Sequence, residues 1–306
     1  MARAVRFDHY GGREVLYIAD VEIPEPPAGE VVVEVRAAAI NPGEVSIREG
    51  ALADVFPATF PSGEGSDLAG VVSSVGDGVT EFAVGDEVLG WSWRRSSHAE
   101  YSAVPITQLI HKPAGLGWEV AGSLYVVGCT AYAAVRAVSA GAGDTVAVSA
   151  AAGGVGTVVV QLLRLKGANV LGIASEHNHA WLREHGATPI AYGDGLADRL
   201  RAAAPDGIDA FIDLFGPDYV QLAVDLGIQR DRINTIIARQ KAAELGTKVE
   251  GSANASTTEV LSEIAELVAS GEVEIPIAAT FPLDEVRAAY AEIEARHTRG
   301  KIVLIP

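Results

Sequence analysis

The stretch VSAAAGGVGTVVVQLLRLKGANVLGIAS, residues Val148–Ser175, interrupts an apolar run with three glycines within four positions. A strand-like segment, Thr145–Ala150, precedes the glycines, and an apolar helical pattern follows them. Ala151, Gly153 and Gly156 have the spacing of a G-x-G-x-x-G fingerprint, with alanine in the first place. Because an uncompensated glycine costs about 0.5–1 kcal/mol relative to alanine, the pattern predicts a turn shaped for a ligand.

Each glycine of this turn has a physical role if the ligand is a dinucleotide. Gly153 lets the backbone approach a pyrophosphate, Gly154 keeps the turn tight, and Gly156 lets the helix pack against the sheet. The N–H groups at the start of the helix, that of Val155 included, then face the anion with a partial positive charge. The alternative is a tight strand-to-helix turn without a ligand. The strand before the glycines and the helix after them favour dinucleotide binding.

The end of the next strand holds the residue that distinguishes NAD from NADP, because an acidic side chain there binds the ribose 2′-hydroxyl and repels a 2′-phosphate. This chain has Ser175, a neutral donor, at that place. Glu176 could take the acidic role if the strand ends one residue later. His177, Asn178 and Tyr192 are candidates for phosphate contacts, although none has a permanent positive charge. We expect NADPH as the cofactor, rather than NADH.

Length, charge and cysteine content limit the classes of protein to which the chain can belong. The chain has 306 residues, which suits two domains, and 49% hydrophobic residues, which indicates a well-buried globular protein. Its formal charge of −17 argues against nucleic acid and anionic membranes as partners, since both require clustered cations. The single cysteine, Cys129, excludes an internal disulfide and a multi-cysteine zinc site. Without a secretory signal or a long apolar stretch, we expect a soluble cytoplasmic protein.

The first third of the chain is rich in strand-like segments bounded by Gly, Pro and Asp. These segments are Glu30–Ile40, Leu68–Gly76, Gly85–Trp91 and His98–Pro105. Several short strands separated by turn signals indicate a small barrel or sandwich. From about Val120 onward, strands alternate with helical patterns, which predicts a parallel sheet covered on both faces.

The end of the chain returns to a strand pattern. We expect a helix from Asp284, as N-cap, to about Ala295, and then a strand over Lys301–Ile305. A strand needs a sheet, so this tail is expected to join the N-terminal β-domain. The strand in Arg232–Ala238 could lie at the edge of its sheet.

With these motifs, the sequence resembles the zinc-independent medium-chain dehydrogenase/reductases of the quinone oxidoreductase group. The resemblance covers essentially the whole chain and rests on AAINPGEVSIREG (Ala38–Gly50), GSDLAGVVSSVGDGVTEFAVGDEV (Gly65–Val88), SHAEYSAVP (Ser97–Pro105), VGCTAYAAV (Val127–Val135), AGDTVAVSAAAGGVGTVVVQLLRLKGANV (Ala142–Val170) and RGKIVLIP (Arg299–Pro306). It implies an α/β protein with a GroES-like β-barrel domain, residues 1–122 and 275–306, and a Rossmann domain with a doubly wound parallel sheet, residues 123–274. It also implies an active site in the cleft and a homodimer joined through sheet edges.

The resemblance bears on metal chemistry. The zinc-dependent branch of the family binds catalytic zinc through a cysteine and a His-Glu pair, which correspond here to the region Asn41–Glu44 and to Ser66-Asp67. Neither offers a zinc-binding set, so we expect no metal. Without a Lewis acid, carbonyl and alcohol interconversion is disfavoured. Hydride delivery to a quinone or an α,β-unsaturated carbonyl remains feasible, because the conjugated carbonyl absorbs the charge.

Catalytic residues follow from the resemblance only in part. Asn41 matches the asparagine that faces the nicotinamide pocket, where its amide could donate to an enolate oxygen; a turn residue before Pro42 is the alternative. Related enoyl reductases place a proton-donating tyrosine near the position of Ser46, and Glu44 stands where aspartate is common. No catalytic acid is therefore assigned, and bulk water could reprotonate the product.

Further cofactor contacts are implied along the chain. Thr130 matches a threonine on the nicotinamide side, with helix N-capping as the alternative. Phe215 and Gly216 belong to a turn beneath the cofactor ribose, or to an ordinary strand terminus. Ala238 ends a strand whose backbone meets the carboxamide. Lys301 could approach the cofactor or be solvated. Asn178 replaces a lysine that relatives often use for the 2′-phosphate.

The sequence leaves the role of one aromatic and basic loop undecided. Trp91 and Trp93, with Arg94 and Arg95, could border the substrate cleft. A core edge and a subunit contact are the alternatives.

The sequence therefore predicts an NADPH-dependent reductase of a quinone or an α,β-unsaturated carbonyl. A dedicated enoyl reductase of a secondary-metabolite pathway is a narrower version. A non-catalytic NADPH-binding module for redox sensing or structure is the alternative from another class, which the missing tyrosine keeps open.

Overall fold

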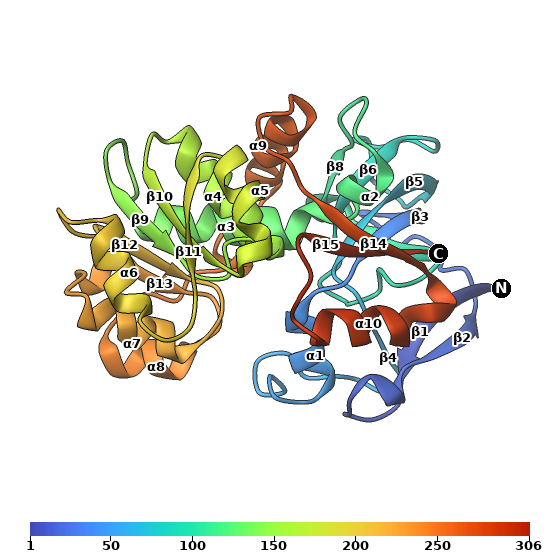
Figure 1. Ribbon diagram of the computed structural model, residues 1–306. Coiled ribbons are helices and arrows are strands. Elements are labelled where there is room, and N and C mark those ends of the chain that lie inside the picture. The colour runs from blue at the N-terminus through green and yellow to red at the C-terminus, as the bar shows by residue number, and fades with distance from the viewer. The chain divides into compact units, whose positions relative to one another are not determined.

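The computed structural model describes all residues, 1–306, and divides into two compact units (Figure 1). Unit 1 contains Met1–Val126, Thr257–Ala269 and Pro276–Pro306, and unit 2 contains Val127–Ser256 and Ser270–Ile275. Helix α3, Leu124–Ala137, begins in unit 1 and continues into unit 2. None of the helices combines the length and the apolar character that crossing a membrane requires.

Unit 1 is built on β-sheets. Its strands are β1 (Ala2–Phe7), β2 (Tyr17–Val21), β3 (Glu30–Ala39), β4 (Ser62–Gly63), β5 (Asp67–Val75), β6 (Glu87–Trp91), β7 (Tyr101–Pro105), β8 (Leu109–His111), β14 (Ile277–Pro282) and β15 (Lys301–Ile305). A seven-stranded sheet has the order β14-β15-β3-β5-β6-β8, with β7 paired to β3, and a three-stranded sheet has the order β2-β1-β4. Val33, Val72 and Val88 pack in its core, as the strand pattern of the first third predicts.

The helices of unit 1 are α1 (Pro42–Arg48), α2 (Trp118–Ala121), α9 (Thr258–Ala269) and α10 (Val286–Glu294). The chain end joins the N-terminal sheet as predicted, because β15 pairs with β3 through Val303 opposite Ala39. The predicted N-cap is wrong: α10 is preceded by Glu285, and the Asp284 carboxylate instead binds the Arg3 guanidinium at 2.9 Å.

Unit 2 has five parallel strands, β9 (Thr145–Val148), β10 (Asn169–Ala174), β11 (Ala187–Ala191), β12 (Ala210–Asp213) and β13 (Ile233–Thr235), in the order β11-β10-β9-β12-β13. This is the order of a Rossmann sheet, with a topological switch point between β9 and β12. Its other helices are α4 (Gly154–Leu165), α5 (His179–Glu184), α6 (Leu196–Ala203), α7 (Pro217–Asp225) and α8 (Arg239–Leu245).

Helices cover both faces of this sheet, as the alternation of strands and helices predicts. Leu171 and Ile173 of β10 pack in one core cluster with Leu200 of α6. Gly172, which lies between them, faces the other side, where an added Cβ would lie 3.1 Å from Leu182 of α5. The doubly wound sheet is therefore confirmed.

Strand β13 lies at the edge of the sheet, as expected, but its outer side is occupied. The Lys248 N–H donates to the Ile233 carbonyl at 2.9 Å, and the Thr235 N–H donates to the Lys248 carbonyl at 3.1 Å. The Asn234 amide holds the Glu250 backbone through bonds of 3.0 and 2.7 Å. Assembly through this edge stays a prediction.

Candidate functional site

The glycine turn lies between β9 and α4 in unit 2. Ala150 has a positive φ of 46°, and the Gly153 N–H donates to the Ala150 carbonyl at 2.9 Å, which closes the turn before the helix. A Cβ at Gly156 would lie 2.2 Å from the Ala150 carbonyl oxygen, and one at Gly153 would lie 3.3 Å from it. Gly156 is therefore required for the first turn of α4 to pack against the backbone of the loop, and Gly153 only tightens it.

Three buried polar side chains join the carboxyl ends of β9, β12 and β13; we call them the carboxyl-edge network, Ser149, Asp213 and Thr235. The Ser149 hydroxyl donates to Asp213 Oδ1 at 2.8 Å and accepts from the Leu214 N–H at 2.8 Å. The Thr235 hydroxyl donates to Asp213 Oδ2 at 2.7 Å. None of the three was expected as a site residue, although Ser149 and Asp213 directly close apolar strands. The network spans the switch point at which open α/β sheets bind ligands.

The carboxyl-edge network also shapes the two loops that hold expected cofactor residues. The N–H groups of Phe215 and Gly216 donate to Asp213 Oδ1 at 3.0 and 3.1 Å. The Ala238 N–H donates to the Thr235 hydroxyl at 3.0 Å. The structure therefore places Phe215, Gly216 and Ala238 in loops fixed by one buried carboxylate, and the contacts of these residues with the cofactor stay predictions.

Three large apolar side chains are exposed at the same edge of the sheet: Tyr192 follows β11, Phe215 follows β12 and Ile237 lies after β13. The Phe215 ring contacts the Tyr219 ring edge to face, with centroids 5.6 Å apart. Exposed aromatic groups next to fixed polar groups are typical of ligand sites. Cofactor contacts by Tyr192 and Phe215 stay predictions.

The segment after β10 is polar and uncharged except for Glu176. Strand β10 ends at Ala174, so Ser175 directly follows it, and Glu176 does not occupy the strand end. The Asn178 amide donates to the Ser175 hydroxyl at 3.1 Å and to His177 Nε2 at 3.1 Å. The Asn178 side-chain oxygen is buried without a hydrogen-bond partner. Ser175, His177 and Asn178 thus form one cluster where a ribose would lie.

Thr130 lies in the middle of α3, which begins at Leu124. The alternative of helix N-capping is therefore wrong. The neighbouring Cys129 side chain is fully buried, as expected of a small apolar residue.

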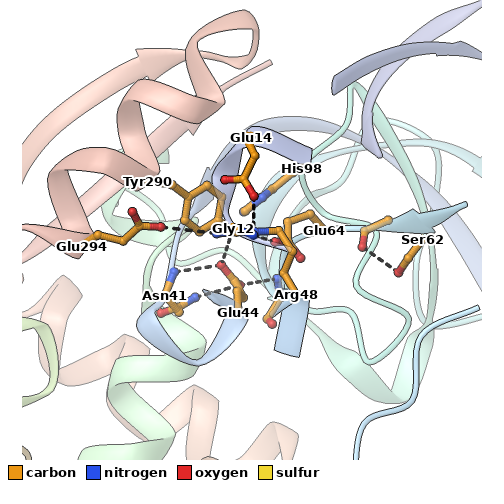
Figure 2. A network of polar contacts seen from close by, with 12 residues as sticks. Gly12, Glu14, Asn41, Glu44, Arg48, Ser62, Glu64, His98, Tyr290 and Glu294 are labelled. Atoms are coloured by element: carbon orange, nitrogen blue, oxygen red, sulfur yellow. Dashed lines mark hydrogen bonds and ion pairs between the residues drawn. The ribbon is translucent and has the colours of Figure 1, made fainter. Parts of the chain in front are cut away.

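A second set of buried polar side chains lies in unit 1, around the start of α1. We call it the Glu44 network; its members are Asn41, Glu44, Arg48, Glu64, Asp67, His98, Tyr290 and Lys301. Figure 2 shows Asn41, Glu44, Arg48, Glu64 and Tyr290 close together. Only Asn41 and Lys301 among these were expected as site residues.

The Asn41 amide is fully engaged inside the Glu44 network. Its Nδ2 donates to Glu44 Oε1 at 3.1 Å and to Asp67 Oδ2 at 2.9 Å, and its Oδ1 accepts from Lys301 Nζ. The side chain is only 4% exposed. Asn41 is therefore more than a turn residue before a proline, but both of its amide hydrogens are already donated to carboxylates.

Glu44 is the hub of the network. Its carboxylate accepts from the Asn41 N–H at 2.8 Å, the Ser66 N–H at 3.0 Å and the Tyr290 hydroxyl at 2.9 Å. Burial, followed by the nearby negative charge of Glu44, raises the pKa of Tyr290 well above its usual value. Burial lowers the pKa of His98, whose Nε2 lies 3.2 Å from the Ala39 carbonyl. Tyr290 therefore stays protonated, and its hydroxyl donates a hydrogen bond to Glu44.

Arg48 and Glu64 form a fully buried ion pair at 3.0 Å. The guanidinium also lies 3.4 Å from Glu294 Oε1 and 4.5 Å above the Tyr290 ring. Burial, with a smaller contribution from Glu44, outweighs the opposing effect of Arg48 and raises the pKa of Glu64 to about 8. One oxygen of Glu64, Oε2, has no hydrogen-bond partner.

Lys301 and Asp67 complete the network. Lys301 is 4% exposed, so the alternative of a solvated lysine is wrong. Its ammonium donates to the Ile40 carbonyl at 3.2 Å and lies 3.6 Å from Asp67 Oδ2. Asp67 Oδ1 accepts from the Val126 N–H at 2.7 Å, in the first turn of α3. Burial raises the pKa of Asp67 against the lowering effect of Lys301.

The donor set of these side chains bears on the expected zinc independence, which stays a prediction. The region Asn41–Glu44 and the pair Ser66-Asp67, which the resemblance aligns with the zinc ligands of the metal-dependent branch, contain no thiolate or imidazole. The Asp67 carboxylate among them is already paired with the Lys301 ammonium. The structure shows no group of three or more His, Cys, Asp or Glu side chains placed to hold a metal ion.

Comparisons with known proteins agree with the fold. Residues 27–114 match the alcohol dehydrogenase GroES-like domain, and residues 185–304 match the family described as zinc-binding dehydrogenase. The quinone oxidoreductase of Pseudomonas aeruginosa is 32% identical over 329 residues, covering 100% of both chains.

Solved structures of similar chains point the same way. The quinone oxidoreductase of Coxiella burnetii has a TM-score of 0.89 at 30% identity, covering 100% of this chain and 99% of that one. The Escherichia coli quinone oxidoreductase complexed with NADPH has a TM-score of 0.88 at 25% identity, covering 99% and 100% of the two chains. With a matching GroES-like domain, a Rossmann sheet and full-length similarity, this chain belongs to the quinone oxidoreductase-like group of the medium-chain dehydrogenase/reductases.

Proposed function

We propose that the chain is an NADPH-dependent reductase that transfers a hydride to a quinone or an α,β-unsaturated carbonyl without zinc. The coarser part of this proposal, an NAD(P)H-dependent oxidoreductase, is supported by the family and by the relatives named above. The observation that carries it is the carboxyl-edge network. Ser149, Asp213 and Thr235 fix the loops at the switch point of the sheet beside the glycine turn.

The residues of this edge fit a dinucleotide. The glycine turn brings backbone close to the start of α4, whose first N–H groups lack partners within the helix and suit a pyrophosphate. Ser175 offers a hydroxyl to the ribose, and the carboxyl-edge network holds the loops of Gly216 and Ala238 that we propose to contact the rest of the cofactor. The bound nicotinamide supplies the hydride; the chain binds and orients it.

The reaction balances without a metal. A quinone takes one hydride from the cofactor and one proton from water, so NADPH, a proton and quinone give NADP⁺ and hydroquinone. In the enone version, the hydride adds to the β-carbon and the enolate takes its proton at the α-carbon. Neither version requires a Lewis acid, because the conjugated carbonyl holds the developing negative charge. The two versions differ only in the acceptor.

Asn41 is the proposed donor to that charge, and the structure sets a condition on the role. One of its amide hydrogens must leave Glu44 or Asp67 to reach a substrate oxygen. If both bonds persist, Asn41 is instead a positioning residue at the start of α1. Reprotonation from water remains the proposal, since Tyr290 donates its hydroxyl to Glu44.

NADPH, rather than NADH, is proposed from Ser175. The position after β10 has a neutral hydroxyl, which does not repel a 2′-phosphate as a carboxylate would, and the Asn178 amide donates to this hydroxyl at 3.1 Å. Glu176 lies beyond the strand end, within the short turn Glu176–Asn178. Calorimetric titration with NADPH and NADH tests this choice, and tighter binding of NADH would overturn it.

The decisive experiment follows NADPH absorbance with a panel of quinones and enones. Turnover with either class is expected. Tight NADPH binding with no turnover on any acceptor would reject the reductase and favour the non-catalytic module. Light scattering tests the homodimer, and the cytoplasmic location stays a prediction.

A further inference from the structure

One tryptophan in unit 1 is conspicuously exposed. Trp93 lies in the loop between β6 and β7 and is 49% exposed, whereas Trp91, two residues earlier, is buried. Trp91 stacks on the Tyr125 ring, with centroids 4.6 Å apart and an angle of 10° between the planes. Trp91 is thus a core residue, and Trp93 is the aromatic side chain that the loop presents.

The two arginines of the loop form hydrogen bonds with other groups of unit 1. Both terminal nitrogens of Arg94 donate to the Glu30 carboxylate, at 2.6 and 2.7 Å. The Arg95 guanidinium donates to the carbonyls of Phe56 and Pro57, at 3.3 and 3.2 Å. Both cations are paired within unit 1, although the Arg94 side chain is 58% exposed, and Trp93 is the apolar side chain that the loop presents.

The loop holds Trp93 in a fixed place. The Trp93 N–H donates to Gln108 Oε1 at 3.1 Å, and the Ser96 hydroxyl lies 2.8 Å from both the Ser92 and the Ser102 hydroxyls. Arg95 adopts a positive φ of 54°, a backbone conformation that is strained for this residue type and persists where its surroundings enforce it. These contacts hold the backbone from which the Trp93 ring projects, and a side chain that projects from a held backbone loses less freedom on binding a partner.

The place is adjacent to the Glu44 network. The Trp93 ring meets the Tyr125 ring edge to face, with centroids 6.1 Å apart. Tyr125 precedes Val126, whose N–H is bound by Asp67, and Asp67 in turn binds the Asn41 amide. All of these residues belong to unit 1.

We propose that Trp93 determines acceptor specificity, by giving planar quinones that carry a fused aromatic ring a ring surface that aliphatic enones cannot use. This inference rests on the proposed reductase function and narrows its substrate class to quinones. Aromatic rings attract one another in stacked or edge-to-face geometry beyond the effect of the area they bury, whereas an aliphatic enone gains only the area. A quinone carries no charge, which suits a loop whose cations are already paired.

A small acceptor fits this surface better than a second copy of the chain. A stable interface buries about 800 Å² on each partner around a central apolar core. Here one exposed ring is flanked by Arg94, whose guanidinium is paired with Glu30. An interface role is kept as an outcome of the test.

The test compares Trp93→Leu and Trp93→Phe with menadione, a planar bicyclic quinone, and with cyclohexenone, an aliphatic enone. Trp93→Leu is expected to raise KM for menadione roughly 3- to 10-fold and to leave KM for cyclohexenone within about 2-fold. Trp93→Phe should restore most of the menadione KM. The control is Val84→Ala, which removes an exposed apolar side chain at the opposite end of β6 and should change neither KM.

Equal changes of KM for the two acceptors, or no change for menadione, would overturn the inference. A change in oligomeric state of Trp93→Leu by light scattering would assign Trp93 to an interface instead. Equilibrium dialysis of menadione without NADPH separates the two proposals: weaker binding by Trp93→Leu supports the aromatic contact even if turnover is absent. Undiminished binding by Trp93→Leu rejects the contact, while absence of turnover in the unsubstituted chain rejects the reductase.

Discussion

At the carboxyl edge of the unit 2 sheet, a single carboxylate is surrounded by neutral donors, whereas around Glu44 in unit 1 several charged side chains are buried together. Asp213 accepts from the hydroxyls of Ser149 and Thr235 and from two backbone N–H groups. In the Glu44 network, Arg48, Glu64 and His98 each keep one buried polar atom without a partner.

The difference lies in what each network depends on. A buried carboxylate with neutral donors on both oxygens fixes the geometry of the loops around it. Buried charges of both signs compensate one another only while all are present, because the loss of one leaves another unpaired at low dielectric. We therefore expect the carboxyl-edge network to respond to the loss or reversal of single hydrogen bonds and the Glu44 network to changes of charge.

The largest expected effect is the removal of the buried cation. Above about pH 8, where Glu64 is ionised, Arg48→Met leaves Glu64 and Glu294 without their guanidinium, and we expect the free energy of unfolding to fall by about 3–5 kcal/mol in urea denaturation at that pH. The matched control is Arg201→Met, whose pair with Asp198 lies at the surface and whose loss should cost less than about 1 kcal/mol. Similar losses for the two variants would contradict the contrast between buried and exposed pairs.

Glu64 should contribute a pH dependence of stability of its own, beside those of Asp67, whose pKa is also raised, and of His98, whose pKa is lowered. The pKa of Glu64 rises from an ordinary 4.5 to about 8 in the folded chain, so between these values the folded state holds a proton that the unfolded state has released. The free energy of unfolding therefore falls as pH rises through this window, by at most about 1.4 kcal/mol per pH unit, and levels off above about pH 8.

Glu64→Gln should remove that slope. Thermal or urea unfolding of both chains across the window measures it, and the variant should gain stability relative to the unsubstituted chain as pH rises. Glu100→Gln serves as the control, because hydrogen bonds from Arg3 lower the pKa of Glu100 and place its effect at acid pH. An unchanged slope in Glu64→Gln would show that another group titrates.

The third prediction tests the hydrogen bonds of the carboxyl-edge network. Asp213→Asn keeps the size of the side chain but turns one acceptor into a donor that faces a hydroxyl or two N–H groups. We expect a loss of about 1.5–3 kcal/mol in the free energy of unfolding and weaker NADPH binding in calorimetry. Ser149→Ala, which removes one donor to the same carboxylate, should lose less. Unaltered NADPH binding in Asp213→Asn would show that the carboxyl-edge network does not support the proposed cofactor site.

The sequence predicts these two regions to different degrees. Apolar residues repeat every two positions in a strand and about every three and a half positions in a helix. These local repeats are sufficient to find the parallel sheet, the glycine turn and the returning strand Lys301–Ile305. The carboxyl-edge network was missed, although Ser149 and Asp213 each end an apolar strand, a place where a buried polar side chain leaves a readable signal.

The Glu44 network could not be found in this way. Tyr290 and Glu44 are 246 residues apart, and Arg48 and Glu64 come from separate elements. Charged residues are exposed in most contexts, so composition alone favours a solvated Lys301, and only the fold shows that its ammonium is buried. The wrong N-cap has the same origin, since Asp284 is taken by Arg3 from the other end of the chain.

The smallest expected effect tests the glycine turn within one motif. Gly156→Ala places a methyl group 2.2 Å from the Ala150 carbonyl oxygen, while Gly153→Ala places it 3.3 Å from the same atom. The first variant must shift α4 away from the turn, which costs about 1–3 kcal/mol of stability and should weaken NADPH binding in calorimetry. The second needs a shift of only a few tenths of an ångström, so its stability should hold while NADPH binding weakens, because the methyl group lies where the pyrophosphate approaches. If Gly153→Ala binds NADPH as tightly as the unsubstituted chain, the proposal that the pyrophosphate lies at this turn is wrong.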